Sequence, residues 1–160
     1  MRFWPVRLTA RAALAGGILF GVGVGALAGI GGYTFIYARG FSYMTNDPQS
    51  CANCHVMQAH LDAWRKGSHH AVATCNDCHT PHEFVGKWVT KSINGFNHSL
   101  AFTTGNFHEP FQITARNRAV TEGTCRSCHQ DIVDQITFHA PGSDREMSCI
   151  RCHSGVGHMQ

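Results

Sequence analysis

The most continuous hydrophobic pattern in the chain lies near its N-terminus. No charged side chain occurs among the 27 residues of segment 12–38, whereas Arg2, Arg7 and Arg11 precede it. At a rise of about 1.5 Å per residue, this segment exceeds the roughly 20 residues that cross a bilayer. Because basic residues favour the cytoplasmic side, the pattern predicts a cytoplasmic segment 1–11, a transmembrane anchor 12–38 and a periplasmic domain 39–160.

A cleaved secretory signal peptide is the alternative interpretation, since Ala26-Leu27-Ala28 has the small residues of a cleavage site. Apolar residues continue beyond that site to Phe35 and Ile36, which a cleaved signal has no reason to contain. The sequence therefore favours a retained, single-pass anchor in the cytoplasmic (inner) membrane.

A second segment, residues 83–100, has the apolar periodicity of a helix. Its apolar residues are Phe84, Val85, Trp88, Val89, Ile93, Phe96 and Leu100. A polar row recurs at intervals of four, three and four residues and therefore lies on one helix face. This row consists of Lys87, Lys91, Asn94 and His98. A solvated face is the usual explanation of such a row.

The composition indicates a small domain that depends on cofactors. The 160 residues include 8 Cys and 12 His, and 14% of them are charged. A chain of this length cannot supply two independent cores without metals or covalent links. Of the 13 Lys and Arg, three precede the anchor, which leaves 10 against 10 Asp and Glu from residue 39 onward. This balance gives no indication of nucleic-acid binding.

Every cysteine belongs to one repeated motif, CxxCH. Its four copies are Cys51-Ala-Asn-Cys54-His55, Cys75-Asn-Asp-Cys78-His79, Cys125-Arg-Ser-Cys128-His129 and Cys149-Ile-Arg-Cys152-His153. Two thiols at this spacing bind a haem covalently, and the following histidine becomes an axial ligand of the iron. Disulfides or zinc sites would not require a histidine after each second cysteine. The sequence predicts four covalently bound haem c groups.

The spacing of the motifs indicates how the haems are arranged. Their first cysteines are 24, 50 and 24 residues apart, which suggests two di-haem units in tandem. Because the domain is short, the porphyrins must form most of its core, wrapped by short helices and loops. The expected fold is mainly α, with one N-terminal transmembrane helix and a multihaem domain.

The second axial ligands must come from residues outside the motif histidines. The candidate histidines are His60, His69, His70, His82, His98, His108, His139 and His158. His70 lies five residues before Cys75 and His158 five residues after His153. Neither can easily reach the far face of its own haem, so we expect each to bind a different one. His60 and His82 follow their motifs so closely that a supporting or solvated role is the simpler interpretation.

Met57 gives the first motif an extension that the other three lack. A thioether ligand stabilises reduced iron, so Met57 as a ligand would make haem 1 chemically distinct. Packing of Met57 against the porphyrin is an equal alternative.

A membrane-anchored haem protein also needs a site where a two-electron, two-proton donor is oxidised. Lys91 and His98, seven residues apart on one helix face, are candidates to bind a quinol oxygen and accept its proton. They are the predicted catalytic residues, with the solvated face as the alternative.

With these motifs the chain resembles the NapC/NirT-type tetrahaem cytochromes c over essentially its whole length. The resemblance continues through the stretches around the motifs, namely Asn46-Asp47-Pro48, Pro81-His82, Lys91, Asn97-His98-Ser99 and His158. It implies a menaquinol dehydrogenase that passes electrons to the catalytic subunit of a periplasmic pentahaem cytochrome c nitrite reductase and has no nitrite site itself. The shortness of the chain favours this partner over those of longer relatives.

The resemblance also implies roles for single residues. Met57 would bind the iron of haem 1, His55 need not, and Lys91 would contact menaquinol. His70 and His158 resemble the distal ligands of the family, alongside the motif ligands His79, His129 and His153. The place of His98 can hold Asp near the open face of haem 1, and a lysine of the partner would complete one haem.

Two other functions fit the same motifs. One is the same kind of quinol dehydrogenase serving another periplasmic reductase, which co-purification would distinguish. The other is a membrane-tethered haem sensor or assembly subunit without net electron flux, which steady-state quinol oxidation would distinguish.

Overall fold

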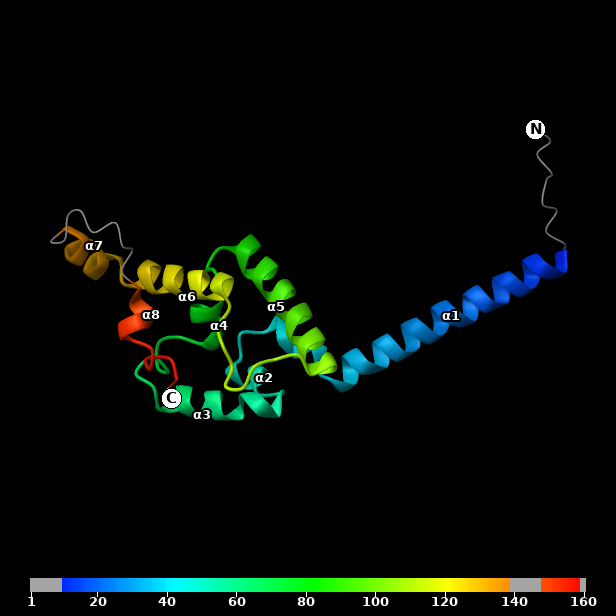
Figure 1. Cartoon of the computed structure of the whole chain (residues 1–160), viewed down its shortest axis with the longest axis horizontal. Coiled ribbons are helices and arrows are strands. Elements are labelled where there is room, and N and C mark those ends of the chain that lie inside the picture. The colour runs from blue at the N-terminus through cyan, green and yellow to red at the C-terminus, as the bar shows by residue number, and fades with distance from the viewer. Residues whose placement is uncertain (1–9, 139–147, 159–160) are drawn as a thin grey trace, which may run out of the picture. The chain divides into compact units, whose positions relative to one another are not determined.

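The computed structural model describes residues 10–138 and 148–158, with side chains throughout these ranges except at 136–138. These residues form helices and connecting loops (Figure 1), and no strand occurs among them. The expected mainly α-helical fold with one long apolar N-terminal helix is confirmed. The chain divides into two compact units, one ending at Phe41 and the other beginning at Ser42.

The first unit is built on α1, Ala10–Tyr37, an apolar helix of 28 residues. Within the described ranges it is the one helix that is long and apolar enough to cross a membrane. At about 1.5 Å per residue it is longer than the ~30 Å hydrocarbon layer. Near its end the rings of Tyr33 and Tyr37 stack with their centroids 5.9 Å apart. Tyrosines are typical of the interface between membrane and water.

The chain leaves α1 through a tight turn. Arg39 has a φ of 52°, a left-handed conformation that is uncommon for residues other than glycine. The Phe35 ring lies directly against Gly40, so a side chain at this position would displace it. Phe35 also contacts Phe41 edge-on, with the ring centroids 4.9 Å apart.

The helices that follow α1 are short, apart from one of 21 residues. They are η1 (Gly40–Met44), α2 (Pro48–Cys51), η2 (His55–Met57), α3 (Gln58–Lys66), α4 (Cys75–His79), α5 (Phe84–Thr104), α6 (Ala115–Cys128), α7 (Gln130–Phe138) and α8 (Cys149–Cys152). The helix expected over residues 83–100 is therefore present as α5 and continues for one further turn.

Local capping interactions explain where several of these helices begin and end. The Asp47 carboxylate caps α2, and the Glu83 carboxylate accepts a hydrogen bond from the first turn of α5. At α4, the Asp77 carboxylate accepts from the Thr74 backbone N–H (2.7 Å) and hydroxyl (2.8 Å). Gly105 ends α5 with a φ of 70°, a conformation that favours glycine.

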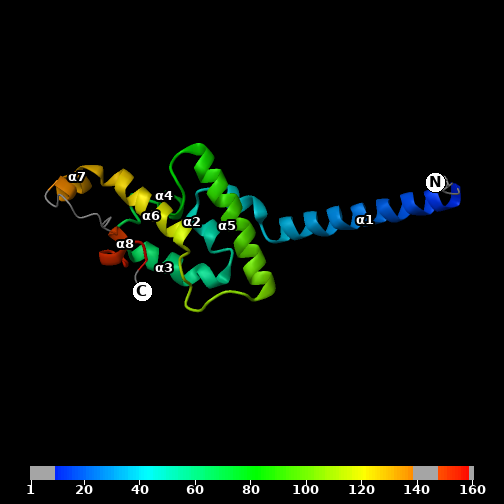
Figure 2. The ribbon, with the colours of Figure 1, turned by 45° about the horizontal axis from the view of Figure 1, so that its top comes forward.

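In the second unit, α4 packs against α6 (Figure 2). The hydroxyl of the buried Thr124, on α6, donates a hydrogen bond to the Cys78 carbonyl at 3.0 Å. The hydroxyl of the buried Thr80 donates to the Asn76 carbonyl at 2.8 Å. The second CxxCH motif is thereby fixed to the helix that ends in the third.

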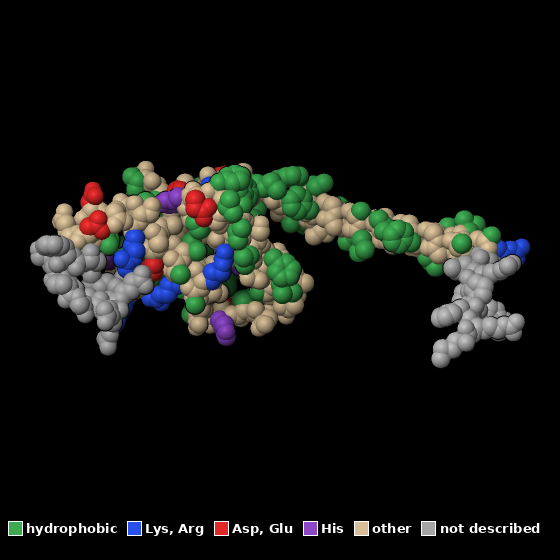
Figure 3. All heavy atoms as spheres, turned by 90° about the horizontal axis from the view of Figure 1, so that it is seen from above, with side chains coloured by type: hydrophobic (Ala, Val, Ile, Leu, Met, Phe, Trp, Pro, Cys, Tyr) green, Lys and Arg blue, Asp and Glu red, His purple; other side chains and the backbone are tan. Residues whose placement is uncertain are grey.

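The polypeptide core is small. Among the described side chains Leu61 is the one buried apolar residue, and the other buried ones are Thr80, Thr90, Lys91 and Thr124. Burying one leucine gains only about 1.5–3 kcal/mol, far less than the entropy lost on ordering a domain. Many apolar side chains are instead exposed (Figure 3). A polypeptide core this small fits the expectation that bound porphyrins form most of the core of the domain.

The longest helix of the second unit, α5, turns Lys91 of its polar row toward the protein. Thr90 and Lys91 are buried, with 1% and 6% of their surface exposed. At about 100° per residue, five apolar residues fall within an arc of roughly 80° on the side opposite Lys91. We name them the outer stripe: Val85, Val89, Ile93, Phe96 and Leu100, each between 39% and 69% exposed. The polar row is therefore not a simple solvated face.

Candidate functional site

The CxxCH motifs lie at helical turns. The second motif forms α4, the third ends α6, the fourth forms α8 with His153 directly after it, and the first lies between α2 and η2. Residues three apart on a helical turn share one face, so both thiols of a motif can reach one porphyrin. None of the eight cysteines forms a disulfide in the structure. This arrangement fits covalent attachment of haem and not a disulfide framework.

The motifs follow one another in space in the order of the sequence. The Cys51 and Cys75 side chains lie close to each other, which brings the first motif next to the second. Cys78 is within electrostatic range of Cys128, and Cys125 of Cys149. Adjacency therefore extends across the 50-residue interval between the second and third motifs. The four attachment sites form a continuous series and not two separate pairs.

Two pairs of histidine rings have the separation of axial ligands on one iron. The His79 and His158 ring centroids are 5.9 Å apart and the rings are inclined by 14°. The His69 and His129 centroids are 6.1 Å apart at 79°. When two imidazoles bind opposite sides of one metal ion, their ring centres are separated by two imidazole–metal bonds of about 2 Å and by the distance from each ring centre to its bonding nitrogen. These lengths add up to roughly 6 Å. Both pairs therefore fit an iron between them.

The structure brings His158 to the second motif, away from its own. It places His69, which the sequence did not single out, beside His129, whereas the neighbouring His70 packs edge-on against Trp64 at 5.8 Å. Adjacent residues on a short connection point in different directions, and no periodicity distinguishes them in the sequence.

Fewer contacts describe the surroundings of the other predicted iron ligands. Met57 is half-buried at the end of η2, and His153 follows α8. The His60 ring lies 5.2 Å from that of His158 and stacks on Phe111 at 6.2 Å, which suits a supporting role. His139 lies outside the described residues.

Lys91 has a specific environment on the inner side of α5. Its ammonium donates a hydrogen bond to the Thr45 carbonyl at 2.8 Å and lies 5.3 Å from the centre of the Trp88 ring and 5.9 Å from that of Tyr43. Burial lowers the pKa of Lys91, and the charge of Lys87 lowers it further. The ammonium therefore lies in a partly desolvated site beside two aromatic rings, where a nearby anion would interact with it strongly.

The Thr45 carbonyl links Lys91 to the haem motifs. It also accepts a hydrogen bond at 3.1 Å from the side-chain amide of Asn76, inside the second motif. The same amide donates to the Asn46 side chain at 2.9 Å. Lys91 is also within electrostatic range of Cys51 in the first motif. The ammonium thus lies where the first two motifs meet.

His98 lies nearly two turns further along α5 on the face that carries Lys91. Its ring is exposed overall, yet its neighbours desolvate it enough to lower its pKa. The lowered pKa favours a neutral imidazole at neutral pH, which can accept a proton. His98 is also within electrostatic range of His79.

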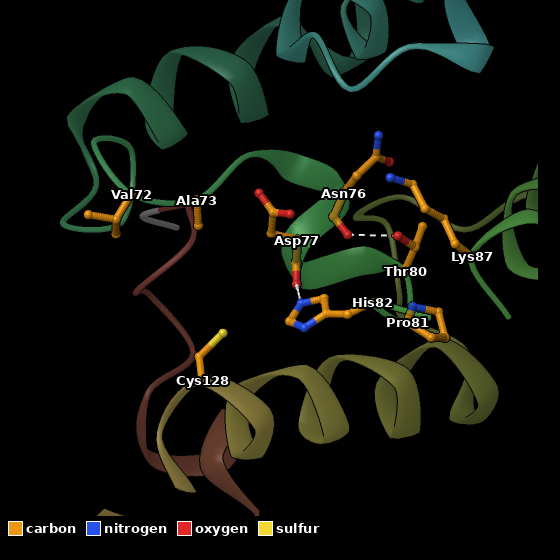
Figure 4. A pocket seen from close by; sticks show the side chains of 9 residues that line it. All are labelled: Val72, Ala73, Asn76, Asp77, Thr80, Pro81, His82, Lys87 and Cys128. Carbon is orange, nitrogen blue, oxygen red and sulfur yellow. Dashed lines mark hydrogen bonds between the residues drawn. The ribbon is translucent and has the colours of Figure 1, made fainter. Parts of the chain in front are cut away.

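A cavity of about 350 Å³ adjoins the second and third motifs. Figure 4 shows Asn76 and Asp77 of the second motif on one side of it and Cys128 of the third on another. His82 Nε2 donates to the Asp77 carbonyl at 3.0 Å, and its Nδ1 lies 3.4 Å from the Ser127 hydroxyl. The cavity therefore provides space at a cysteine of the third motif, and the His82 ring is held at its edge.

Glu122 is a residue of this site that sequence reasoning missed. From α6, its carboxylate accepts hydrogen bonds from the backbone N–H groups of Cys149 (2.8 Å) and Ile150 (3.2 Å) and from the Ser148 hydroxyl. It therefore caps α8, which carries the fourth motif, from 27 residues away in the sequence. Only Ser148, a typical residue before a helix, signalled a cap there.

Comparisons with known proteins identify the family of the chain. The NapC/NirT cytochrome c family, N-terminal region, matches residues 11–160. The cytochrome c-type protein NrfH of Wolinella succinogenes is 32% identical over 137 residues, which cover 78% of this chain and 77% of that protein. The cytochrome c-type protein NapC of Haemophilus influenzae is 32% identical over 148 residues, which cover 74% and 72%.

A solved structure is similar over nearly the whole chain. It is a chain in the crystal structure of a cytochrome c nitrite reductase NrfHA complex bound to the HQNO inhibitor. The TM-score is 0.62 and the sequence identity 25%, over 92% of this chain and 90% of that one.

Proposed function

The chain belongs to the NapC/NirT cytochrome c family and carries covalently bound haem c, and from this premise we propose that it is a membrane-anchored menaquinol dehydrogenase. It relays electrons through four haems to a periplasmic multihaem nitrite reductase. The haems, when bound, supply a series of one-electron carriers. The residues of the chain hold these carriers, bind the electron donor and take up its protons.

The placement of Lys91 is the observation that carries this proposal. Lys91 is only 6% exposed, and burying a charged side chain costs solvation free energy. A functional role explains this cost better than packing does. A quinol oxygen that replaces the Thr45 carbonyl would keep the hydrogen bond of the ammonium, while Asn76 still donates to that carbonyl. Beside the ammonium, the quinol hydroxyl loses its proton more readily.

His98 is the proposed acceptor of that proton. Its lowered pKa keeps the ring neutral, and its position on the same face of α5 brings it toward the same donor. Its exposure gives the proton a route to water. In this proposal Lys91 binds the donor and His98 removes its proton.

The ring pairs support an assignment of iron ligands. We infer that His79 and His158 hold the iron of haem 2 and that His129 and His69 hold that of haem 3. His153 would bind the iron of haem 4 and Met57 that of haem 1. His70, the ligand expected from the sequence, then serves to pack against Trp64.

The topology is part of the proposal. Residues 1–11 are cytoplasmic, 12–38 cross the inner membrane and 39–160 are periplasmic, where haem c is attached. The length of α1 and the arginines that precede the apolar segment support this orientation.

The partner is proposed to be the catalytic subunit of a cytochrome c nitrite reductase. Similarity to a chain of an NrfHA complex supports it. Reduction of nitrite to ammonium consumes six electrons, so a relay without a nitrite site must dock on an enzyme that collects them. The haem-loaded chain should oxidise a menaquinol analogue alone, yet reduce nitrite only when the catalytic subunit is present. Rapid nitrite turnover by the chain alone would overturn this division.

A second candidate is the same dehydrogenase serving another periplasmic reductase. The similarity to NapC of Haemophilus influenzae favours it about as strongly in identity and coverage. Mass analysis of the reductase that co-purifies with the detergent-solubilised chain decides between the two.

A further inference from the structure

The outer stripe of α5 is an apolar surface that no described part of the second unit covers. Its five residues point away from the buried Lys91. Both charged residues within α5, Lys87 and Lys91, belong to the polar row, so the stripe itself carries no charge. A helix in water normally has the opposite arrangement, with its apolar face toward the protein. The stripe lies on the side of α5 opposite Lys91 and the first two haem motifs, so we assign its covering to an apolar environment outside the unit.

The chain connection limits how far α5 can lie from the membrane. The Tyr43 ring lies within 3.2 Å of the position that a Cβ of Gly95 would take, so Tyr43 packs on the middle of α5. Only six Cα–Cα steps lead from Tyr37, the last residue of α1, to Tyr43. Three of these steps lie in η1, at about 2 Å each, and the other three span at most ~11 Å. Whatever the orientation of the units, the backbone of Tyr43, whose ring packs on α5, is within about 17 Å of the end of the anchor.

Exposed apolar side chains continue along this connection. Phe41, Tyr43 and Met44 of η1 are 65%, 45% and 58% exposed. Apolar exposure therefore runs from the anchor through η1 to the helix on which Tyr43 packs. The short connection to a membrane-spanning helix distinguishes α5 from the helices that follow it in the unit.

We propose that the outer stripe of α5 lies in the periplasmic interface of the bilayer, so that α5 is a second, monotopic membrane contact. An uncharged apolar face beside a membrane anchor is suited to the boundary between headgroups and acyl chains. The inference rests on the proposed role of α1 as a membrane anchor, and it does not require quinol oxidation.

This contact deepens the role of Lys91. A helix with its side chains is about 10–12 Å across. With the outer stripe in the interface, the ammonium on the inner side lies within about one helix diameter of the lipid. A quinol dissolved in the membrane then reaches Lys91 with its headgroup while its tail stays among the acyl chains.

Photochemical crosslinking tests the contact on the full-length, haem-loaded protein. The protein is reconstituted in nanodiscs of phosphatidylcholine and phosphatidylglycerol that contain a lipid with a diazirine in its acyl chain. After irradiation and digestion, adducts are mapped by mass spectrometry. We expect adducts on peptides of α5 at the outer stripe, in addition to those on α1. Adducts on α1 with none on α5 would overturn the proposal.

Matched variants identify the surface. The double variant Val89→Asp with Phe96→Asp should lose the α5 adducts and keep those on α1 and the haem content. Ile132→Asp removes an apolar residue on α7 that is 56% exposed, and it should keep the α5 adducts. Adducts on α5 that persist in the double variant would contradict the proposed face.

Two further outcomes separate this inference from the proposed function and from a protein partner. Menaquinol oxidation without α5 adducts would overturn the membrane contact and leave the dehydrogenase standing. Adducts that disappear when the nitrite reductase catalytic subunit is added would assign the stripe to that subunit, and would also overturn the inference.

Discussion

Glu122 is expected to hold the fourth CxxCH motif in place. Its carboxylate accepts hydrogen bonds from the first backbone N–H groups of α8, at Cys149 and Ile150, and from Ser148 just before them. Glu122→Ala removes the acceptor and leaves these donors to water. The start of α8 should then open more often, with the rest of the protein unaffected.

The size of the effect follows from the kind of interaction. Loss of a helix N-cap costs about 0.5–2 kcal/mol. Glu122 is part-buried, so water replaces its hydrogen bonds only in part, and we expect a cost of about 1–2 kcal/mol. This free energy corresponds to roughly 5- to 30-fold faster hydrogen exchange at the Cys149 and Ile150 amides.

Hydrogen exchange read by mass spectrometry on the haem-loaded protein measures this effect. Glu83→Ala is the matched control, since Glu83 caps α5 through the Gly86 backbone N–H at 2.6 Å. It should speed exchange at the start of α5 and leave α8 unchanged. Unchanged exchange at Cys149 and Ile150 in Glu122→Ala would refute the capping role.

The same cap has a defined pH dependence. Burial alone would raise the pKa of Glu122, but the hydrogen bonds from Ser148, Cys149 and Ile150 outweigh it and the net pKa is lowered. A lowered pKa in the folded state gives stabilisation that is present above the unfolded value, ~4.3, and is lost as pH falls through the folded value. The difference between wild type and Glu122→Gln should therefore stay constant near neutral pH and shrink in acid.

Three further changes test the ligands and the proton acceptor. His69→Ala should convert one low-spin haem to high spin by absorption and EPR spectroscopy, whereas His70→Ala should leave the spectra unchanged; the reverse pattern would restore His70 as the ligand. Met57→Ala should alter one haem signal, and four unchanged signals would mean that Met57 only packs against the porphyrin. His98→Ala should slow menaquinol oxidation less than a change at Lys91, because the lysine fixes the donor; an equal loss in steady-state kinetics would contradict this order.

Features carried by local patterns were predictable from the sequence. The apolar run at residues 12–38 corresponds to α1 at Ala10–Tyr37, and the periodicity of residues 83–100 corresponds to α5. The repeated CxxCH motif identified haem attachment without any structure. In each case the signal lies within a few helical turns, where spacing alone determines which side chains share a face.

Features that depend on contacts between distant segments were not predictable. Periodicity placed Lys91 and His98 on one face of a helix, but it could not tell whether that face meets protein or water. Only the contact with Thr45, 46 residues away, shows that Lys91 is turned inward. The choice between His69 and His70, and the cap supplied by Glu122, likewise depend on tertiary packing.

The central claim is that Lys91 binds the quinol, and the rate at which a menaquinol analogue reduces the haems tests it most directly. In stopped-flow absorption, Lys91→Met should slow this reduction about 10- to 150-fold, the equivalent of one charged hydrogen bond. The variant should keep four haems that dithionite reduces fully, because Asn76 still donates to the Thr45 carbonyl. Lys66→Met, at an exposed position of α3, should behave as wild type. A near-normal rate in Lys91→Met would contradict the account and place quinol oxidation elsewhere.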